Sequence, residues 1–175
     1  TEITFTPSNK IFTSIKFDID IINKRVQELS FLNAGVNIEV KDERTAKSKT
    51  FKNSGGVAGY VKFLKGRKQS VCETFHCEGS QDDITVEVAM QWNDSYSENV
   101  LCYTNNIPQK DGGTHLSGFR ASLTRVLKAF IKKEELNKKA PIELLGEDVR
   151  EGLIAVISVK AVSYTHLTLP TILLV

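Results

Sequence analysis

The sequence predicts a single layered α+β domain. Apolar and polar residues alternate over short runs, which favours strands, and apolar residues recur at steps of three and four over longer runs, which favours helices. Turn residues separate the two kinds of run. The 175 residues are 41% hydrophobic and 25% charged, without internal repeats or low-complexity tracts, as expected for a soluble globular protein.

Charge and cysteine content exclude several classes of protein. The formal net charge of +2 is too small to indicate nucleic-acid binding from composition alone. Cys72, Cys77 and Cys102 form no C-x-x-C pair, which argues against a metal site or a disulfide framework and favours reduced thiols in a cytoplasm. The apolar run at the end is too short for a bilayer and contains Pro170, so we expect a cytoplasmic protein without a membrane partner.

The first expected element is a strand. Ile3 and Phe5 alternate with polar neighbours, and Pro7 ends the run. Because a lone strand is not stable and the chain starts inside this run without a Met, we expect its sheet to lie upstream. After a linker, a helix is expected to start at Asp18 or Asp20, to stop at 33–35, and to carry the apolar stripe Ile19, Ile22, Val26, Leu29 and Leu32.

A hairpin and a short helix are expected next. Val36, Ile38 and Val40 alternate with polar residues, and the run 50–52 is a partner strand after a charged loop over 42–48. A helix is then expected to begin at Gly55-Gly56 and to end at residues 66–69. Further strands are expected over 71–77, 84–92, 100–103 and 153–160, with a turn and a short acidic helix over 145–152.

The stretch 105–120 connects the third of these later strands to the strongest helix. Pro108 is expected to end strand pairing because it has no N–H to donate. Gly112-Gly113 permits backbone angles that other residues avoid, and Thr114 is the expected N-cap. The helix is expected to run to about Leu136, with a core face formed by Leu116, Phe119, Leu123, Val126, Leu127 and Phe130.

This stretch also contains the candidate chemistry. Arg120, Lys128 and Lys132 fall on a basic face beside the apolar one. A glycine turn at a helix N-terminus can bind an anion such as phosphate, but a tight turn with an ordinary cap is the commoner use of Gly-Gly-Thr. His115 has no evident Ser or Cys nucleophile beside it, which favours a structural role over general-base catalysis.

The run NNIPQKDGGTHLSGFR, residues 105–120, resembles the signature of the DNA gyrase B family of type II topoisomerases. The runs ELSFLNAGV (28–36), VEVAMQWND (86–94) and REGLIAVISVK (150–160) look like the same family in the same order. The resemblance covers 1–160 and is closer to gyrase than to its paralogue, topoisomerase IV.

The resemblance implies a domain organisation. In the family, an ATP-binding domain of the gyrase/Hsp90/histidine-kinase type precedes a transducer domain and a metal-binding domain that helps to cleave DNA. Residues 1–13 would then be the C-terminal end of the ATP-binding domain, including its last strand, and a linker, and 14–160 the transducer domain. The implied fold is a ribosomal-protein-type two-layer α+β fold with a mixed, mostly antiparallel sheet and helices on one face.

The resemblance also implies ATP and Mg²⁺ as cofactors of the intact protein. Thr1 would match a residue near the adenine pocket and Ile3 an apolar neighbour, whereas the catalytic glutamate, the Mg²⁺-binding asparagine and the glycine-rich lid would lie upstream. We therefore expect no catalytic residue, no metal ligand and no ATPase activity in 1–160 alone. A Gln-Thr-Lys loop should follow Lys160, but 161–175 resembles sequencing-adapter read-through, so we expect a non-native tail there.

Two functions are compatible with these observations. In the first, the chain couples ATP binding and hydrolysis to DNA strand passage in a negatively supercoiling topoisomerase. Its partners would be double-stranded DNA, the gyrase A protein in an A2B2 heterotetramer, and a second copy of the gyrase B protein. Gln109, Gly112, Gly113, Thr114 and His115 would form the hinge motif, and Arg120, Lys128 and Lys132 would line the DNA cavity. For Arg120, a salt bridge within the fold, to an acidic residue near Asp148, is an equal alternative. In the second function, the chain is a stand-alone α+β nucleic-acid-binding module.

Overall fold

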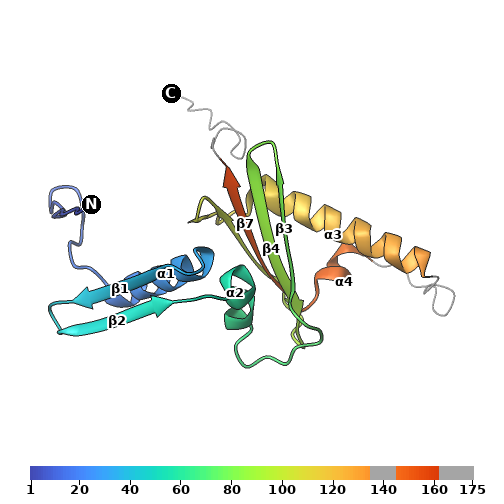
Figure 1. Cartoon of the computed structure of the whole chain (residues 1–175), viewed down its shortest axis with the longest axis horizontal. Coiled ribbons are helices and arrows are strands. Elements are labelled where there is room, and N and C mark those ends of the chain that lie inside the picture. Colours follow the sequence, from blue (N-terminus) through green and yellow to red (C-terminus); the bar gives the residue numbers. More distant parts are fainter. Residues whose placement is uncertain (135–144, 162–175) are drawn as a thin grey trace.

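A computed structural model describes residues 1–134 and 145–161. Its centre is a five-stranded sheet in the order β3–β4–β7–β5–β6 (Figure 1). The strands are β3 (Phe75–Gln81), β4 (Ile84–Trp92), β5 (Asn99–Thr104), β6 (Ile107–Pro108) and β7 (Leu153–Ala161). Only the β5–β7 pair is parallel, so the sheet is mixed and mostly antiparallel, as predicted.

Strand β7 lies in the middle of the sheet and is buried on both faces. Leu153, Ala155, Ile157 and Val159 project to one side, and Ile154 and Val156 project to the other, each with an exposed fraction of 1% or less. A strand covered on both faces favours a continuous apolar run rather than an alternating one, which is what the segment 153–157 provides.

One face of the sheet is covered by α2 (Gly56–Lys65), with α1 (Ile19–Leu32) packed behind it. The rings of Phe31 and Tyr60 stack with their centroids 5.0 Å apart, which joins the two helices. Helix α1 begins where the sequence predicts, because the side chain of Asp18 accepts hydrogen bonds from the N–H groups of Asp20 and Ile21 at 2.9 and 3.3 Å.

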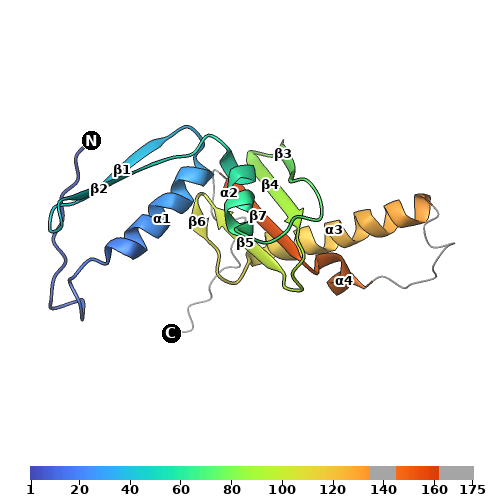
Figure 2. The same cartoon turned by 90° about the horizontal axis from the view of Figure 1, so that it is seen from below.

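The opposite face is covered by α3 (Gly113–Lys133), beside which lies α4 (Gly146–Arg150) (Figure 2). The expectation of two layers with helices on one face is therefore wrong. The physical reason is the double-sided burial of β7: its two sets of apolar side chains each need a covering helix, and a sheet with helices on one face would leave one set in water.

The predicted hairpin is present as β1 (Asn37–Asp42) and β2 (Lys47–Lys52) and packs against α1, at the opposite end of the molecule from α3 (Figures 1 and 2). Its charged turn is shorter than expected, because β2 already begins at Lys47. Phe51 is buried and anchors this two-stranded ribbon.

Three further expectations are corrected by the structure. The described residues contain no strand before β1, and Ile3 and Phe5 are 83% and 71% exposed, because no strand lies beside them to accept their backbone bonds. Strand β3 starts at Phe75 rather than at Val71. Pro108 does not end pairing but pairs with Tyr103 in β6, at the edge of the sheet, where its missing N–H is tolerated.

Candidate functional site

The turn between β6 and α3 is built around two left-handed glycines. Gly112 and Gly113 have φ angles of +76° and +62°. A Cβ atom on residue 112 would lie 2.1 Å from Cδ2 of Leu116, so only glycine fits there. Gly112 is the N-cap of α3, which corrects the expectation for Thr114. Thr114 instead lies exposed in the first helical turn, because the left-handed backbone starts the helix two residues earlier than its side chain could.

Other hinge residues hold this turn in place. The N–H of Gln109 donates to the carbonyl of Cys102 at 2.8 Å, and the N–H of Gly112 donates to the carbonyl of Gln109 at 3.1 Å. The ring of His115 lies against Gly113, and within the described residues neither ring nitrogen has a hydrogen-bond partner. Burial lowers the pKa of His115, so the ring is neutral at pH 7. These surroundings indicate that His115 packs against the turn as a structural residue.

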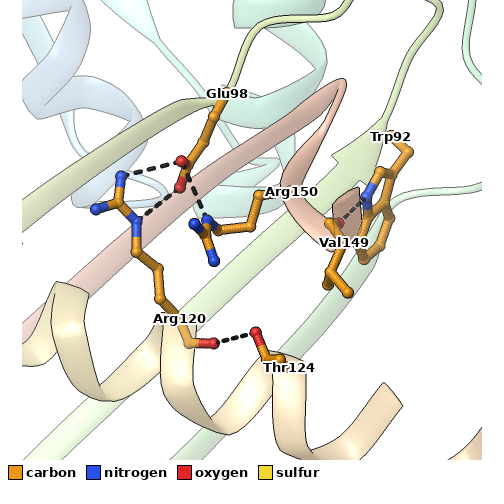
Figure 3. A network of polar contacts seen from close by, with 6 residues as sticks. All are labelled: Trp92, Glu98, Arg120, Thr124, Val149 and Arg150. Atoms are coloured by element: carbon orange, nitrogen blue, oxygen red, sulfur yellow. Dashed lines mark hydrogen bonds and ion pairs between the residues drawn. The ribbon is translucent and has the colours of Figure 1, made fainter. Parts of the chain in front are cut away.

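Arg120 lies in a network of two arginines and one carboxylate (Figure 3). Its Nε and Nη2 donate to the two carboxylate oxygens of Glu98 at 2.9 and 3.0 Å, and Nε of Arg150 donates to the same carboxylate at 3.3 Å. The salt bridge within the fold is thus present, but its partner is Glu98 rather than an acid near Asp148. One carboxylate shared by two arginines leaves this network with a net positive charge.

Neighbouring contacts orient the network. The hydroxyl of Thr124 donates to the carbonyl of Arg120 at 2.9 Å within α3. The indole N–H of Trp92 donates to the carbonyl of Val149 at 2.9 Å, which fixes α4 and hence Arg150 against the sheet (Figure 3). Nη1 of Arg120 has no partner within 1–134 and 145–161, and the Arg120 side chain is 41% exposed. The guanidinium is therefore held on one edge and open on another.

Helix α3 carries positive charge without any acidic residue. Between Gly113 and Lys133 it contains Arg120, Arg125, Lys128, Lys132 and Lys133, and no Asp or Glu. Lys128 and Lys132 are exposed, and neither makes an ion pair with another described residue. The structure therefore places all three predicted cations on one helix, and among the described residues only Arg120 of the three forms an ion pair.

The predicted core face of α3 is only partly buried. Leu116, Phe119, Leu123 and Leu127 pack on the sheet, whereas Val126 and Phe130 are 59% and 53% exposed. The reason is geometric: a helix of 21 residues is about 31 Å long and extends past the end of the sheet (Figure 2). The part of α3 after Leu127 thus stands clear of the sheet.

The remaining predicted residues lie elsewhere. Thr1 and Ile3 are exposed in the N-terminal segment, at the other end of the molecule from α3 (Figure 1). Across the described ranges, no group of three or more His, Cys, Asp or Glu side chains is placed to hold a metal ion, and no helix has the length and apolar character to cross a bilayer. Residues 162–175, most of the expected tail, lie outside the described residues, whereas Ala161 is the last residue of β7.

Comparison with known sequences and structures identifies related proteins. The family model for DNA gyrase B matches residues 56–165. The DNA gyrase B protein of Rickettsia bellii is 49% identical over 164 residues, which cover 91% of this chain and 20% of that protein. The DNA gyrase B protein of Streptococcus pneumoniae is 48% identical over 164 residues, which cover 91% of this chain and 25% of that protein. The chain thus spans a fifth to a quarter of the length of these relatives.

Two solved structures have the same fold. The 43K ATPase domain of Thermus thermophilus gyrase B, in complex with an aminocoumarin, matches with a TM-score of 0.78 and 35% identity over 90% of this chain and 43% of that chain. The topoisomerase IV ATP-binding domain of Francisella tularensis, in complex with a small-molecule inhibitor, matches with a TM-score of 0.72 and 25% identity over 90% of this chain and 42% of that chain.

Proposed function

Because the chain belongs to the DNA gyrase B family, we propose that it is part of an ATP-dependent type II topoisomerase that negatively supercoils DNA. Within that enzyme it acts as the transducer domain: it couples ATP binding and hydrolysis to strand passage. It also lines the cavity through which DNA passes. Residues 14–160 form this domain, and 1–13 are the end of the ATP-binding domain and a linker.

The observation that carries this proposal is the charge and placement of α3. The helix is fixed on the sheet as far as Leu127, and the rest extends into solvent with Lys128 and Lys132 exposed and no acidic residue in between (Figure 2). Such a surface attracts the phosphate backbone of duplex DNA without reading its sequence, as strand passage of any DNA segment requires. The rigid connection from α3 to the sheet allows movement of the sheet to shift this surface.

Arg120 combines both roles that the sequence suggested. Glu98 holds its Nε and Nη2, which fixes the direction of the guanidinium, while Nη1 and the exposed part of the side chain remain available for a phosphate oxygen. Arg150 shares the carboxylate and keeps the network positive. A DNA phosphate can therefore bind Arg120 without breaking the ion pair.

The proposed cofactors and partners follow from the family. ATP and Mg²⁺ bind elsewhere in the intact protein, with Thr1 and Ile3 as remnants of the adenine pocket. The gyrase A protein in an A2B2 heterotetramer, a second copy of the gyrase B protein on ATP binding, and double-stranded DNA are the proposed partners. The related Thermus protein is described as an ATPase domain, which supports the assignment of ATP. The 175-residue chain alone is expected to show no ATPase activity.

The test is a chimeric gyrase B protein. Residues 1–161 replace the corresponding segment of the Streptococcus pneumoniae gyrase B protein, and the chimera is assayed with the gyrase A protein for supercoiling and ATP turnover. We expect ATP-dependent negative supercoiling by the chimera. Arg120→Gln should lower the number of supercoils introduced per ATP by about threefold or more, whereas Arg125→Gln, an exposed arginine on the same helix, should not.

The outcomes separate the claims. A chimera that folds and hydrolyses ATP but never supercoils DNA would overturn the proposed coupling function. A normal ratio of supercoils to ATP in Arg120→Gln would limit Arg120 to its ion pair with Glu98.

A further inference from the structure

Two asparagines form the turn between β5 and β6. Asn105 and Asn106 have φ angles of +47° and +66°. Asparagine tolerates this left-handed region better than other residues with a Cβ, but glycine adopts it more easily. The side chains of the two asparagines make hydrogen bonds that glycine could not make.

Asn105 extends the sheet beyond the end of the β5 backbone. The parallel β5–β7 ladder ends at the pair Thr104–Val159, after which the chain turns away. The N–H of Asn105 donates to the carbonyl of Val159 at 2.8 Å. Its side-chain amide then donates to the carbonyl of Ala161 at 2.9 Å and accepts from the N–H of Ala161 at 2.9 Å. The carboxamide thus takes the place of the next peptide group of a strand and holds the last residue of β7.

Asn106 makes the corresponding connection to α1. Its side-chain amide donates to Oδ1 of Asn33 at 3.0 Å, and Asn33 is the C-cap of α1. The guanidinium of Arg25, which also pairs with Glu28 at 2.9 Å, donates to the backbone carbonyl of Asn106. Two adjacent side chains therefore bind two different elements, the end of β7 and the end of α1.

The same turn leads directly into the hinge of α3. Strand β6 follows the two asparagines, Gln109 is fixed to Cys102, and Gly112 starts the helix. Figure 2 shows β6 between the end of α1 and β5. The turn is thus the place where β7, α1 and the segment before α3 meet.

Resting on the proposed coupling function, we propose that Asn105 and Asn106 are positioning residues that transmit displacement of the C-terminal end of β7 to α1 and to the start of α3. If the end of β7 moves, the paired carboxamide of Asn105 must move with it, and the shift passes along the rigid two-residue turn to Asn106 and its partners. Without the two side chains, the end of β7 keeps its pairing with β4, at Ile84 and Ala161, but loses this connection to α1.

The protein contains a matched control. The turn between β3 and β4 is formed by Asp82 and Asp83, with φ angles of +50° and +61°, and no hydrogen bond from these side chains is found among the described residues. Glycine at either turn keeps the backbone geometry and raises the entropy of the unfolded chain equally. A difference between the two turns therefore reports the side-chain contacts alone.

The first experiment measures amide hydrogen exchange in the 175-residue chain. Asn105→Gly should speed exchange at Ala161 by about tenfold and should also speed it at Asn33, at the end of α1. The single control variant Asp82→Gly should change neither amide by more than about twofold. If Asn105→Gly does not fold, the same exchange measurement is made on Asn105→Asp. This variant keeps the acceptor for the N–H of Ala161 but lacks the donor to the carbonyl of Ala161.

Faster exchange at Ala161 without any change at Asn33 would overturn the proposal, because the two ends would then be uncoupled. The second experiment places Asn105→Gly in the chimeric gyrase B protein. A merely structural defect lowers ATP turnover and supercoiling together, whereas loss of transmission lowers supercoils per ATP by about threefold while ATP turnover is retained. If the chimera without the Asn105→Gly substitution fails to supercoil DNA, the proposed function is overturned. If that chimera works and Asn105→Gly leaves the number of supercoils per ATP unchanged, only this inference is overturned.

Discussion

The two faces of the central sheet are covered in different ways. On the α2 face, Val57 and Val61 are 0% exposed, and the stack of Phe31 on Tyr60 closes the layer. On the α3 face, the first half of a longer helix packs on the sheet, and the second half leaves Phe130 53% exposed. The difference shows that the α2 face buries its helix more completely than the α3 face does, so we expect the α2 face to contribute more to stability.

The polar groups differ between the two faces as well. The α2 face contains a buried pair of neutral hydroxyls, Tyr60 and Tyr103, whose oxygens are 2.9 Å apart. The α3 face contains the partly exposed ion network of Arg120, Glu98 and Arg150. A buried neutral pair depends on complete satisfaction, while a solvated ion network tolerates the arrival of another charge.

The largest effect is expected from removing a phenyl ring on each side. Phe31→Ala should lower the free energy of unfolding by about 3–5 kcal/mol, because it empties a buried site between α1 and α2. Phe130→Ala should cost less than about 1 kcal/mol, because its ring is half exposed already. Urea unfolding of the 175-residue chain measures both values, and equal losses would contradict a division of labour between the faces.

A smaller loss is expected for Tyr60→Phe. The substitution keeps the stacked ring but leaves the buried hydroxyl of Tyr103 without its partner, which should cost about 1–3 kcal/mol. The double variant Tyr60→Phe, Tyr103→Phe removes both hydroxyls and should be more stable than Tyr60→Phe alone. A double variant that is less stable than the single one would show that the Tyr103 hydroxyl is not left unsatisfied in Tyr60→Phe.

The same pair predicts a loss of stability at alkaline pH. Burial raises the pKa of both tyrosines above the ordinary value, so the folded protein keeps protons that the unfolded chain loses. The contribution of this pair to stability should therefore be constant below about pH 10, the unfolded pKa of tyrosine, and fall above it. Burial also raises the pKa of Cys102 to about 11, so its thiol contributes to the same alkaline fall. Urea unfolding as a function of pH is therefore measured in a Cys102→Ala background. The double phenylalanine variant should flatten the alkaline fall.

The sequence predicted local structure better than layer arrangement. The start of α1 and the presence of the hairpin follow from the Asp18 cap and from alternation, which are properties of neighbouring residues, although β2 begins earlier than predicted. The position of α3 across the sheet was missed, although the continuous apolar run 153–157 is typical of a strand buried on both faces. The cap rule failed at Thr114 because the close contact of Gly112 with Leu116 overrides it.

The candidate site was predicted only where it depends on neighbouring residues. The basic face of α3 is a property of one helix and could be read from spacing. Glu98 and Arg150 were missed as partners, because Glu98 is 22 residues from Arg120 and 52 residues from Arg150. Only the parallel crossover from β5 to β7 brings these positions together. No periodicity connects them, so an ion network between elements has no signal in a single sequence.

The next prediction compares lysines on the two faces. Lys128→Gln with Lys132→Gln should lower the salt dependence of binding to a duplex of about 25 base pairs, with a slope reduced by about 2, because each lost phosphate contact removes nearly one released counterion. Lys62→Gln with Lys65→Gln removes the same charge from α2. Its slope should be unchanged. Fluorescence anisotropy between about 50 and 200 mM salt provides the measurement, and equal reductions would indicate that only net charge matters.

The smallest effect concerns the end of α3 that touches the sheet. Burial lowers the pKa of His115, so the unfolded chain takes up a proton at higher pH than the folded protein does. The stabilisation is present above about pH 6.5, the unfolded value, and is lost as the pH falls through the folded pKa. Because the ring is partly solvated, the loss should stay below about 1 kcal/mol. His115→Phe keeps the ring on Gly113 but cannot titrate, so the fall in melting temperature from pH 7 to pH 5 should become shallower. An identical fall in this variant would place the acid-sensitive group away from the hinge, and the α3 face would then be no easier to loosen with acid than the α2 face.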